Sequence, residues 1–461
     1  MGADRGSSRS LPDPWPVVAL GRPVRGAIRV PGSKSLTNRL YVLAALAKGR
    51  SVIEAPLASD DTDRLLVALE RLGATVERSV GQVTIDGCGG RFPGGGRVDL
   101  GDGGTPTRFV LALATLARSA VEVDGSERMR ERPVDEGIAL LRRLGASIDA
   151  RRDEAGVERL PVVVRNGTGG IAGGELEVGR TASSQFLSAL LLIAPSLAGG
   201  LHLRYREAPT SASYLDLTVD AMRSVGLRVD EDRDSTGRLL AHRVPEQVVA
   251  AGARIVEPDA SSAAYFALLA AIVPGSRIEL LGLSRSSRQP DLRFLDALAS
   301  MGARVEASEG GVVVAHAGPL AAVDLDASLF PDASMALAIA CATARGRSVL
   351  RGLGTLRVKE SDRVAALATE LTRLGCEVEA TADTLAIGSL PPRSGPPVAV
   401  ATYRDHRMAM SFTILGLLRG GIAIVDPGCV GKSYPGFFTD LHRLCGEGSR
   451  PDTAKGPWHD A

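Results

Sequence analysis

The sequence predicts an α/β protein made of two pseudo-threefold domains, each with three repeated units. Almost wholly apolar helices are expected six times along the chain, with starts separated by 71 to 78 residues. A second series of amphipathic helices, each ended by a glycine, runs in phase with the first. The 461 residues also exceed what a single hydrophobic core usually organises. Together these observations predict units that contain one buried helix, one outer helix and short strands between them.

The apolar helices each begin at a cluster of small polar or acidic residues. A helix that is apolar on most sides is buried, since a surface helix keeps one polar face. Every helix start carries unpaired N–H groups and a partial positive charge. Six converging starts therefore predict an electropositive centre suited to a small ligand with several negative charges. The expected starts are Ser33, Gly104, Ala182, Ala260, Asp332 and Asp405.

The amphipathic helices lead directly into alternating strands. Each expected helix stops at a glycine in the left-handed conformation, which is a common helix ending. The segment LHRLCGEG near the C-terminus is a candidate sixth, truncated copy. The five full copies end at Gly73, Gly145, Gly226, Gly302 and Gly375.

The repeats also predict the domain boundaries. Three units lie before about Arg254 and three after it, so residues 33–254 are expected to form one lobe. Residues 13–32 and 255–445 form the other, because a strand, GAIRVPG, precedes the first buried helix. The return crossing is expected near ARIVEPDASS, and two crossings make a double hinge. Residues 1–12 and 446–461 are expected to be disordered tails.

Composition excludes several classes of function. The net charge of +1 gives no general attraction to nucleic acid or membrane, and 4% aromatic residues are too few for base-stacking platforms. Five scattered cysteines without a CxxC pair fit reduced thiols and give no metal-ligand spacing. The N-terminus lacks the apolar core of a signal peptide, and no apolar stretch is long enough to span a membrane. A cytoplasmic protein without a metal is expected.

Seven local motifs identify a family more specifically than the repeat of the buried helices does. In order along the chain they are PGSKSLTNR, GSERMRERP, ASSQF, VEPDASSAAYF, PDASMA, RVKESDR and YRDHRMAM. From about Pro31 to Leu441 the chain resembles the 5-enolpyruvylshikimate-3-phosphate (EPSP) synthase family. The resemblance implies an inside-out fold of βαβαββ units around buried helices. It also implies transfer of a carboxyvinyl group from phosphoenolpyruvate to shikimate 3-phosphate, by a monomer that needs no cofactor.

The resemblance assigns one group of residues to shikimate 3-phosphate. Lys34 is expected to touch both substrates. Helix starts with hydroxyl groups and an amide supply most of the other contacts, in keeping with the anion affinity of such sites. Hydroxyl-bearing residues of this kind could instead be ordinary helix caps. The assigned residues are Lys34, Ser35, Arg39, Ser183, Ser184, Gln185, Ser211, Tyr214, Asp332, Thr355 and Lys359.

A second group is assigned to phosphoenolpyruvate. Arginine suits this ligand because its planar guanidinium can bind a carboxylate or phosphate through two hydrogen bonds. Gly104 is expected to leave room for the ligand, since it has no side chain. A lone arginine would more often be a solvated surface charge. The assigned residues are Lys34, Gly104, Thr105, Arg128, Gln185, Arg363, Arg407 and Lys432.

Lys34, Asp332 and Glu360 are the expected catalytic residues by the same resemblance. The reaction must remove the proton of the 5-hydroxyl and add one to C3 of phosphoenolpyruvate, then take one back as phosphate leaves. Asp332 is expected to be the base at the hydroxyl, and Glu360 the acid and base at C3. Asp332 could instead only cap a helix, and Glu360 could be a surface ion-pair partner.

Three positions depart from the pattern of many family members. The chain has LGDGGT where LGNAGT is common, so Asp102 places a carboxylate where an amide is usual. That carboxylate should oppose anion binding unless it is paired or turned away. Thr355 stands where asparagine is common, which puts one substrate hydrogen bond in doubt. Pro106 could reshape the pocket floor.

Other functions remain to be weighed. The sister transferases that act on UDP-N-acetylglucosamine have a cysteine in the loop that reads GSERMRERP here, and no cysteine stands there. A non-catalytic phosphosugar-binding homologue would have no need to retain Lys34, Asp332, Glu360, Arg363 and Lys432 together. An RNA-binding repeat protein would need a basic stripe and stacking aromatics.

Overall fold

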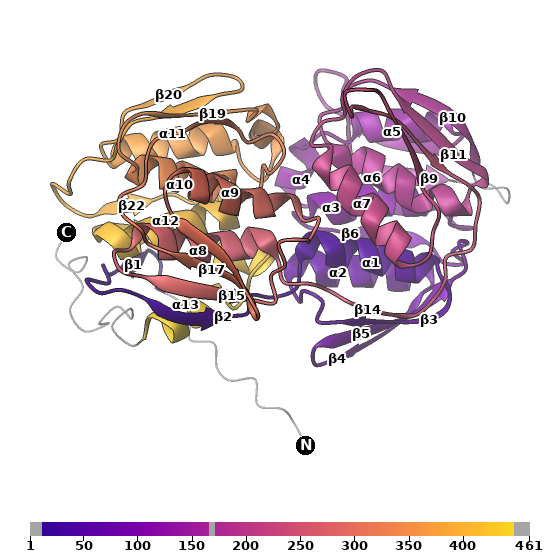
Figure 1. Ribbon diagram of the computed structural model, residues 1–461. Coiled ribbons are helices and arrows are strands. Elements are labelled where there is room, and N and C mark those ends of the chain that lie inside the picture. Colours follow the sequence, from indigo (N-terminus) through magenta and orange to yellow (C-terminus); the bar gives the residue numbers. More distant parts are fainter. Residues whose placement is uncertain (1–11, 166–170, 447–461) are drawn as a thin grey trace.

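The computed structural model describes residues 12–165 and 171–446, which fold around six sheets (Figure 1). The expected tails, residues 1–12 and 446–461, fall almost wholly outside the described residues. The first lobe, which contains α1 to α7, has sheets of strand order β14-β3-β5-β4, β6-β7-β9-β8 and β10-β11-β13-β12. Its strands are β3 (Lys48–Glu54), β4 (Thr75–Ser79), β5 (Gln82–Cys88), β6 (Gly96–Asp99), β7 (Val121–Asp124), β8 (Ser147–Arg152), β9 (Glu158–Arg165), β10 (Ala172–Val178), β11 (Ala198–Tyr205), β12 (Asp230–Arg233), β13 (Leu239–Val244) and β14 (Ala253–Ile255).

The second lobe contains α8 to α13 and the N-terminal strands. Its sheets have the orders β16-β17-β15-β2, β18-β19-β21-β20 and β1-β23-β22. Its strands are β1 (Trp15–Val17), β2 (Arg25–Ile28), β15 (Arg277–Leu281), β16 (Arg304–Ser308), β17 (Gly311–Ala315), β18 (Asp324–Asp326), β19 (Ser348–Arg351), β20 (Val378–Ala380), β21 (Leu385–Ile387), β22 (Val398–Val400) and β23 (Ile422–Ile424).

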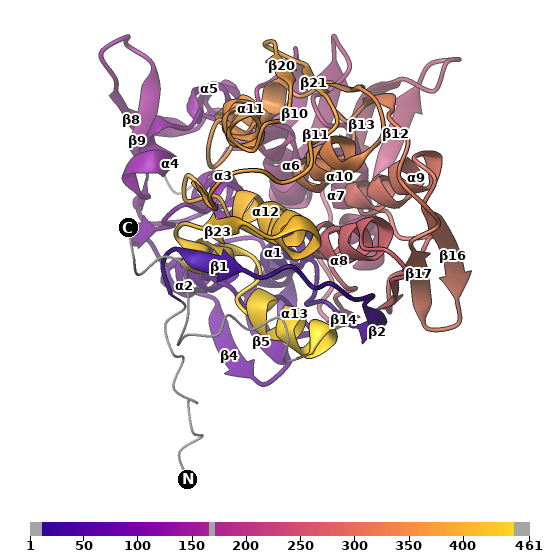
Figure 2. The ribbon, with the colours of Figure 1, turned by 90° about the vertical axis from the view of Figure 1, so that its left-hand side faces the viewer.

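All four-stranded sheets share one pairing pattern. One edge pair is parallel, and the next two pairs are antiparallel, as in β6-β7-β9-β8. In chain order β18, α10, β19, α11, β20 and β21 form one complete βαβαββ unit. The three-stranded sheet keeps the parallel pair of β22 and β23, and β1 pairs antiparallel with β23 in place of a hairpin (Figure 2). The α/β fold class that the sequence predicts is confirmed.

The apolar helices occupy the middle of each lobe. They begin within two residues of the expected starts, and in each lobe the three of them pack against one another pairwise. In α8 every residue except Ser261 is buried. Polar side chains fix several starts: Ser33, Ser183 and Asp405 each accept a hydrogen bond from an N–H of the first turn. The helices are α1 (Lys34–Leu46), α3 (Gly104–Ala114), α6 (Ser184–Ile193), α8 (Ala260–Ile272), α10 (Ser334–Thr343) and α12 (His406–Arg419).

The outer helices follow the second repeat. Gly73, Gly145, Gly226, Gly302 and Gly375 all have positive φ angles of 83° to 112°, as expected for helix-ending glycines. The candidate sixth copy is also a helix, α13, and it ends at Gly446 with φ 77°. These helices are α2 (Asp60–Leu72), α5 (Asp135–Arg143), α7 (Ser213–Ser224), α9 (Arg293–Ser300), α11 (Arg363–Arg373) and α13 (Phe437–Cys445); a short helix, α4 (Glu127–Glu131), precedes α5.

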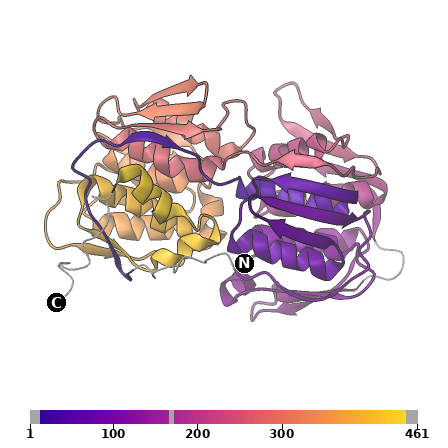
Figure 3. The same cartoon turned by 90° about the horizontal axis from the view of Figure 1, so that it is seen from below.

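The chain passes between the lobes at two adjacent segments. After β2 it enters the first lobe at α1, and after β14 it returns at α8 (Figure 3). The segments are joined by main-chain hydrogen bonds from Ser33 to Glu257 and from Asp259 to Pro31. Ile255 still pairs with Glu54, and Val256 packs in the buried cluster of the first lobe, so that lobe extends at least two residues beyond the expected boundary at Arg254. The buried apolar side chains form two separate clusters, one in each lobe.

Candidate active site

The starts of the buried helices converge where the two lobes meet, and a cavity lies there. Fourteen of the eighteen residues that the sequence selected line it. They come from both lobes, with the start of α1 and α6 on one side and Asp332 and the segment after 3₁₀-helix η3 (Gly354–Val358) on the other. These fourteen are Lys34, Ser35, Arg39, Gly104, Thr105, Ser183, Ser184, Gln185, Ser211, Tyr214, Asp332, Thr355, Lys359 and Glu360.

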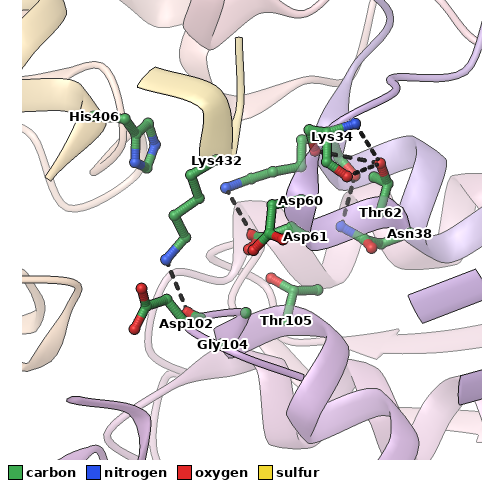
Figure 4. A network of polar contacts seen from close by, with 12 residues as sticks. Lys34, Asn38, Asp60, Asp61, Thr62, Asp102, Gly104, Thr105, His406 and Lys432 are labelled. Carbon is green, nitrogen blue, oxygen red and sulfur yellow. Dashed lines mark hydrogen bonds and ion pairs between the residues drawn. The ribbon is translucent and has the colours of Figure 1, made fainter. Parts of the chain in front are cut away.

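A second cavity adjoins the first and holds two more of the selected residues, Arg128 and Lys432. Glu360 and Arg132 line both cavities, so these two residues lie at the junction. Lys34 extends to Asp61 (Nζ–Oδ2 3.4 Å) and Lys432 donates to the main-chain oxygen of Asp102 (2.8 Å), beside Gly104 (Figure 4). The remaining two selected residues, Arg363 and Arg407, are buried and pair with carboxylates that line the cavity: both bind Asp332, and Arg363 also binds Glu360.

Gln185 is held in place by two hydrogen bonds. Its Nε2 donates to Thr105 Oγ1 (2.8 Å), and its Oε1 accepts from Arg108 Nη1 (2.9 Å). Arg108 also donates to the carbonyls of Gly104 and Pro133, and its guanidinium lies over the Phe186 ring. Burial lowers the pKa of Arg108 to about 9. Arg108 therefore holds the Gln185 side chain and the main chain at Gly104 and Pro133, and its charge is not free in the cavity.

Arg39 and Tyr214 are also engaged by the protein. Arg39 donates to Thr218, Ser188 and two main-chain carbonyls, and burial lowers its pKa to about 10. Tyr214 Oη donates across the lobes to Asp291 Oδ2 (3.3 Å). Burial, together with the charge of Asp332, raises the pKa of Asp291 to about 6.

Asp332 does not cap a helix. The cap position before α10 is Ala333, and the Asp332 carboxylate faces Arg407 (2.8 Å), Arg363 (3.2 Å) and Lys359 (3.8 Å). Burial alone would raise the pKa of Asp332, but Arg407, Lys359 and Arg363 outweigh it and hold the pKa well below its ordinary value. The carboxylate is therefore ionised in the free enzyme.

Glu360 is buried in a cationic environment rather than paired on the surface. Its Oε1 lies 3.0 Å from Lys432 Nζ, and its Oε2 accepts from Arg363 Nη2 at 2.8 Å. Burial favours a raised pKa, yet the charges of Lys432, Arg363 and Arg132 hold the Glu360 pKa well below its ordinary value. Arg363 also binds Asp405 (2.8 Å), so one buried guanidinium joins three carboxylates.

His406 is a residue that the sequence analysis did not select. Its ring is fully buried at the start of α12, and neither ring nitrogen has a hydrogen-bond partner in the described structure. Burial, and then the charges of Lys34 and Arg407, keep its pKa well below the ordinary value, so the ring is neutral. The motif YRDHRMAM contained this residue, but one histidine on an apolar helix gives no signal of its own.

Arg132 is the most informative residue that the sequence analysis missed. It is 5% exposed, and its hydrogen bond goes from Nη1 to the main-chain oxygen of Asp102 (3.3 Å). No carboxylate pairs with it in the described part of the chain, and its buried Nε has no partner. Arg128, which the sequence selected, is instead bound to carbonyls of the other lobe. The motif GSERMRERP held both arginines, and sequence alone could not rank them.

Two of the departures from the family pattern have a structural answer. The Asp102 carboxylate accepts a short hydrogen bond from Ser126 Oγ, which also caps α4, so the carboxylate is paired. The Thr355 hydroxyl is buried, lines the first cavity and has no hydrogen-bond partner among the residues that the structure describes. Thr355 can therefore offer a hydrogen bond to a ligand, as asparagine would.

Three comparisons place the chain among known proteins. The family model described as EPSP synthase (3-phosphoshikimate 1-carboxyvinyltransferase) matches residues 18–441. This chain belongs to that family. It is 37% identical to the 3-phosphoshikimate 1-carboxyvinyltransferase of Shewanella baltica (strain OS185) over 427 residues, 92% of this chain and 97% of the relative. The enzyme of the same name from Photorhabdus laumondii is 37% identical over 425 residues, which cover 91% and 96% of the two chains.

Solved structures agree with the family assignment. The EPSP synthase of Acinetobacter baumannii superimposes with a TM-score of 0.75 at 25% sequence identity, over 94% of this chain and 97% of that one. The resemblance on which the sequence analysis relied is therefore confirmed, as is the inside-out α/β fold class. None of the helices in the described residues has the length and apolar character of a membrane span.

The floor of the site at Gly104 gives a first prediction. A methyl group there would lie 2.6 Å from Arg132 Nη2, so Gly104→Ala must displace the Arg132 guanidinium. Gly104 is in the first turn of α3, where alanine is well tolerated, so folding should be unaffected. We expect the KM for phosphoenolpyruvate to rise about tenfold, since one charged hydrogen bond is weakened, while the KM for shikimate 3-phosphate stays nearly constant.

Steady-state kinetics with each substrate varied in turn would measure this effect. Gly431→Ala is a matched control, because an added Cβ there meets no atom within 4 Å. If Gly104→Ala changed both KM values equally, Gly104 would not be specific to the phosphoenolpyruvate side.

Proposed function

We propose the residues with which this chain performs the reaction of its family. Family membership makes the chain an enzyme that transfers the carboxyvinyl group of phosphoenolpyruvate to the 5-hydroxyl of shikimate 3-phosphate, in the shikimate pathway toward aromatic amino acids. The observation that best supports the site is Arg132, a buried cation that pairs with no carboxylate in residues 12–165 and 171–446 and lines the same two cavities as Glu360. A buried unpaired cation is costly unless a ligand supplies the anion.

Shikimate 3-phosphate is assigned to the first cavity. Hydroxyl and amide groups of Ser183, Ser184, Gln185 and Ser211 line this cavity from the first lobe, together with Lys34. Such groups suit a phosphate, because each donates a hydrogen bond to a phosphate oxygen. The ring hydroxyls would contact Asp332, Thr355 and Lys359, which line the cavity from the second lobe; Ser35, Arg39 and Tyr214 also line it. Arg39 acts mainly by fixing the helix starts, since its donors are already in use.

Phosphoenolpyruvate is assigned to the junction of the two cavities. Its carboxylate and phosphate would lie among Lys34, Arg132, Lys432 and the deeper Arg363 and Arg407. Gly104, Thr105 and Gln185 close this end of the site. Arg132 takes the place that the sequence analysis gave to Arg128.

Asp332 and Glu360 supply the two proton transfers. Asp332, ionised by its cations, takes the proton of the 5-hydroxyl as the oxygen attacks C2, and Glu360 gives a proton to C3. When the bond from C2 to the phosphate oxygen breaks, Glu360 takes a proton back from C3. The proton that Asp332 took from the hydroxyl then passes to the released phosphate or to water. Phosphoenolpyruvate brings negative charge to the cations around Glu360, which raises the Glu360 pKa toward the range where it can carry a proton.

A phosphate-release assay tests the proposed function. The purified enzyme should release phosphate from phosphoenolpyruvate only when shikimate 3-phosphate is present. Release with UDP-N-acetylglucosamine instead would identify the sister transferase. Binding of both substrates without release would identify a non-catalytic phosphosugar-binding homologue.

Closure of the lobes around shikimate 3-phosphate is a further expectation. The proposed ligands come from the first lobe (Lys34, Gln185) and from the second (Asp332, Lys359), so binding should draw the two together. Small-angle scattering should give a smaller radius of gyration when shikimate 3-phosphate is added than without ligand. An unchanged scattering profile would argue against a hinge at the two crossings. A monomeric state, a cytoplasmic location and the lack of a metal or cofactor stay predictions.

A further inference from the structure

The two lobes are joined across the site by side chains that bind main-chain carbonyls. Lys432 donates to the Asp102 carbonyl, and Ser213 Oγ donates to the Leu329 carbonyl at 2.6 Å. The contact with Arg128 differs from both of these, because the carbonyls that it binds belong to two residues that line the site, Lys359 and Glu360. Arg128 belongs to α4 in the first lobe, and the residues that it binds, Lys359 and Glu360, belong to the second.

The geometry of Arg128 is well defined. Its Nε donates to the Glu360 carbonyl at 2.9 Å, and its Nη2 donates to the Lys359 carbonyl at 3.1 Å. Its Nη1 donates to Glu131 Oε2 at 2.7 Å, which fixes the plane of the guanidinium from within α4. All three nitrogens are therefore engaged by the protein, and the fork binds two successive peptide oxygens.

The carbonyls that Arg128 binds belong to residues 359–362, the irregular segment that connects η3 to α11. Lys359 and Glu360 follow the end of η3, and Asp362 caps α11, so these carbonyls make no helical hydrogen bond. The Glu360 side chain is fixed on its other side by Lys432 and Arg363. Arg128 thus fixes the main chain of Glu360 while two cations fix its carboxylate.

We propose that Arg128 is an interlobe positioning residue, which places Glu360 and Lys359 in the site when the lobes close and does not bind phosphoenolpyruvate. Because its partners lie in the opposite lobe, the contact can form only in the closed arrangement. Loss of the contact leaves two carbonyls without their donors and frees the segment from one side. The kinetic part of the test rests on the proposed reaction, whereas the exchange measurement requires only that shikimate 3-phosphate binds.

The test compares Arg128→Gln with Arg130→Gln. Arg130 lies two residues away in α4 with the same exposure (36% against 37%), but its ion pair with Asp124 stays within the first lobe. We expect Arg128→Gln to lower kcat by about 10- to 100-fold, since general acid–base help from a misplaced Glu360 is reduced. Its KM for phosphoenolpyruvate should change less than about threefold. Arg130→Gln should keep both constants.

Hydrogen exchange gives an independent readout. With shikimate 3-phosphate bound, the amides of residues 359–362 should exchange faster in Arg128→Gln than in the unchanged enzyme or in Arg130→Gln. A large rise in KM with little loss of kcat would overturn the proposal and support direct ligand binding by Arg128. Unchanged exchange in 359–362 would overturn it as well. If the unchanged enzyme released no phosphate, the proposed function would fail, while the exchange result would still decide whether Arg128 holds this segment.

Discussion

Glu360→Gln is expected to reduce turnover by roughly two orders of magnitude or more, which is a common loss when a general acid or base is removed. Glutamine has nearly the same shape as glutamate, and its amide oxygen can still accept from Lys432 or Arg363, which now hold the carboxylate at 3.0 and 2.8 Å. It cannot carry a proton between enzyme and C3. The loss should therefore appear in kcat.

Binding should survive the Glu360→Gln substitution. Removal of one negative charge leaves Lys432, Arg363 and Arg132 with more net positive charge, so phosphoenolpyruvate should bind equally well or more tightly. Calorimetric titration of the variant with both substrates would measure this. Glu379→Gln, a change in an exposed ion pair with Arg347, serves as the control for removal of a carboxylate. Near-normal turnover in Glu360→Gln would mean that another group protonates C3.

The buried helices, and therefore their period, were predictable because each helix can be recognised from its own apolar composition. A helix such as α8 is apolar around its whole circumference, so its sequence identifies it without knowledge of its neighbours. The caps at Ser33 and Asp405 are local as well, since each accepts a hydrogen bond from an N–H two or three residues later. The helix starts were accordingly located to within two residues.

The choice between Arg128 and Arg132 could not be made from sequence. Both arginines occur in ERMRER, and both are near the same helix. The short helix α4 ends at Glu131, and Arg132 has an extended main chain that turns its side chain toward Gly104. Arg128, inside the helix, points instead toward the other lobe. The end of a five-residue helix thus decides which arginine enters the site, and local propensity does not determine that end.

The exchange of strands between the lobes also depends on tertiary structure. β2 precedes α1 in the chain, yet it pairs with β15 in the other lobe, and β14 pairs with β3 before the chain reaches α8. The sequence signalled a crossing, because a strand led directly into a buried helix at GAIRVPGSKS. It could not fix the residue at which pairing stops, since Ile255 and Val256 are equally suited to a strand.

Arg132→Gln is expected to lower kcat/KM for phosphoenolpyruvate by about 100-fold, because a buried charged hydrogen bond and its Coulomb attraction are both lost. Binding of shikimate 3-phosphate should change little. The alkaline limb of the profile of kcat/KM against pH should also move. Arg132 is one of the cations that lower the Glu360 pKa, so its removal raises that pKa, and Glu360 keeps the proton that it gives to C3 up to a higher pH than before.

Although Arg132→Gln should lower kcat/KM, it should leave the stability of the free enzyme unchanged or raise it. Arg132 is 5% exposed and makes no direct ion pair with a carboxylate in the described residues, so in the free enzyme the cost of desolvating its charge is offset by longer-range attraction to Glu360 rather than by a paired carboxylate. A neutral glutamine removes that cost, and the midpoint of thermal unfolding without ligands should stay the same or rise. Phosphoenolpyruvate should then stabilise the variant less than the unchanged enzyme, since at a given ligand concentration a weaker ligand stabilises less. A variant that unfolded at a lower temperature and kept its kcat/KM for phosphoenolpyruvate would show that Arg132 supports the fold and binds no anion.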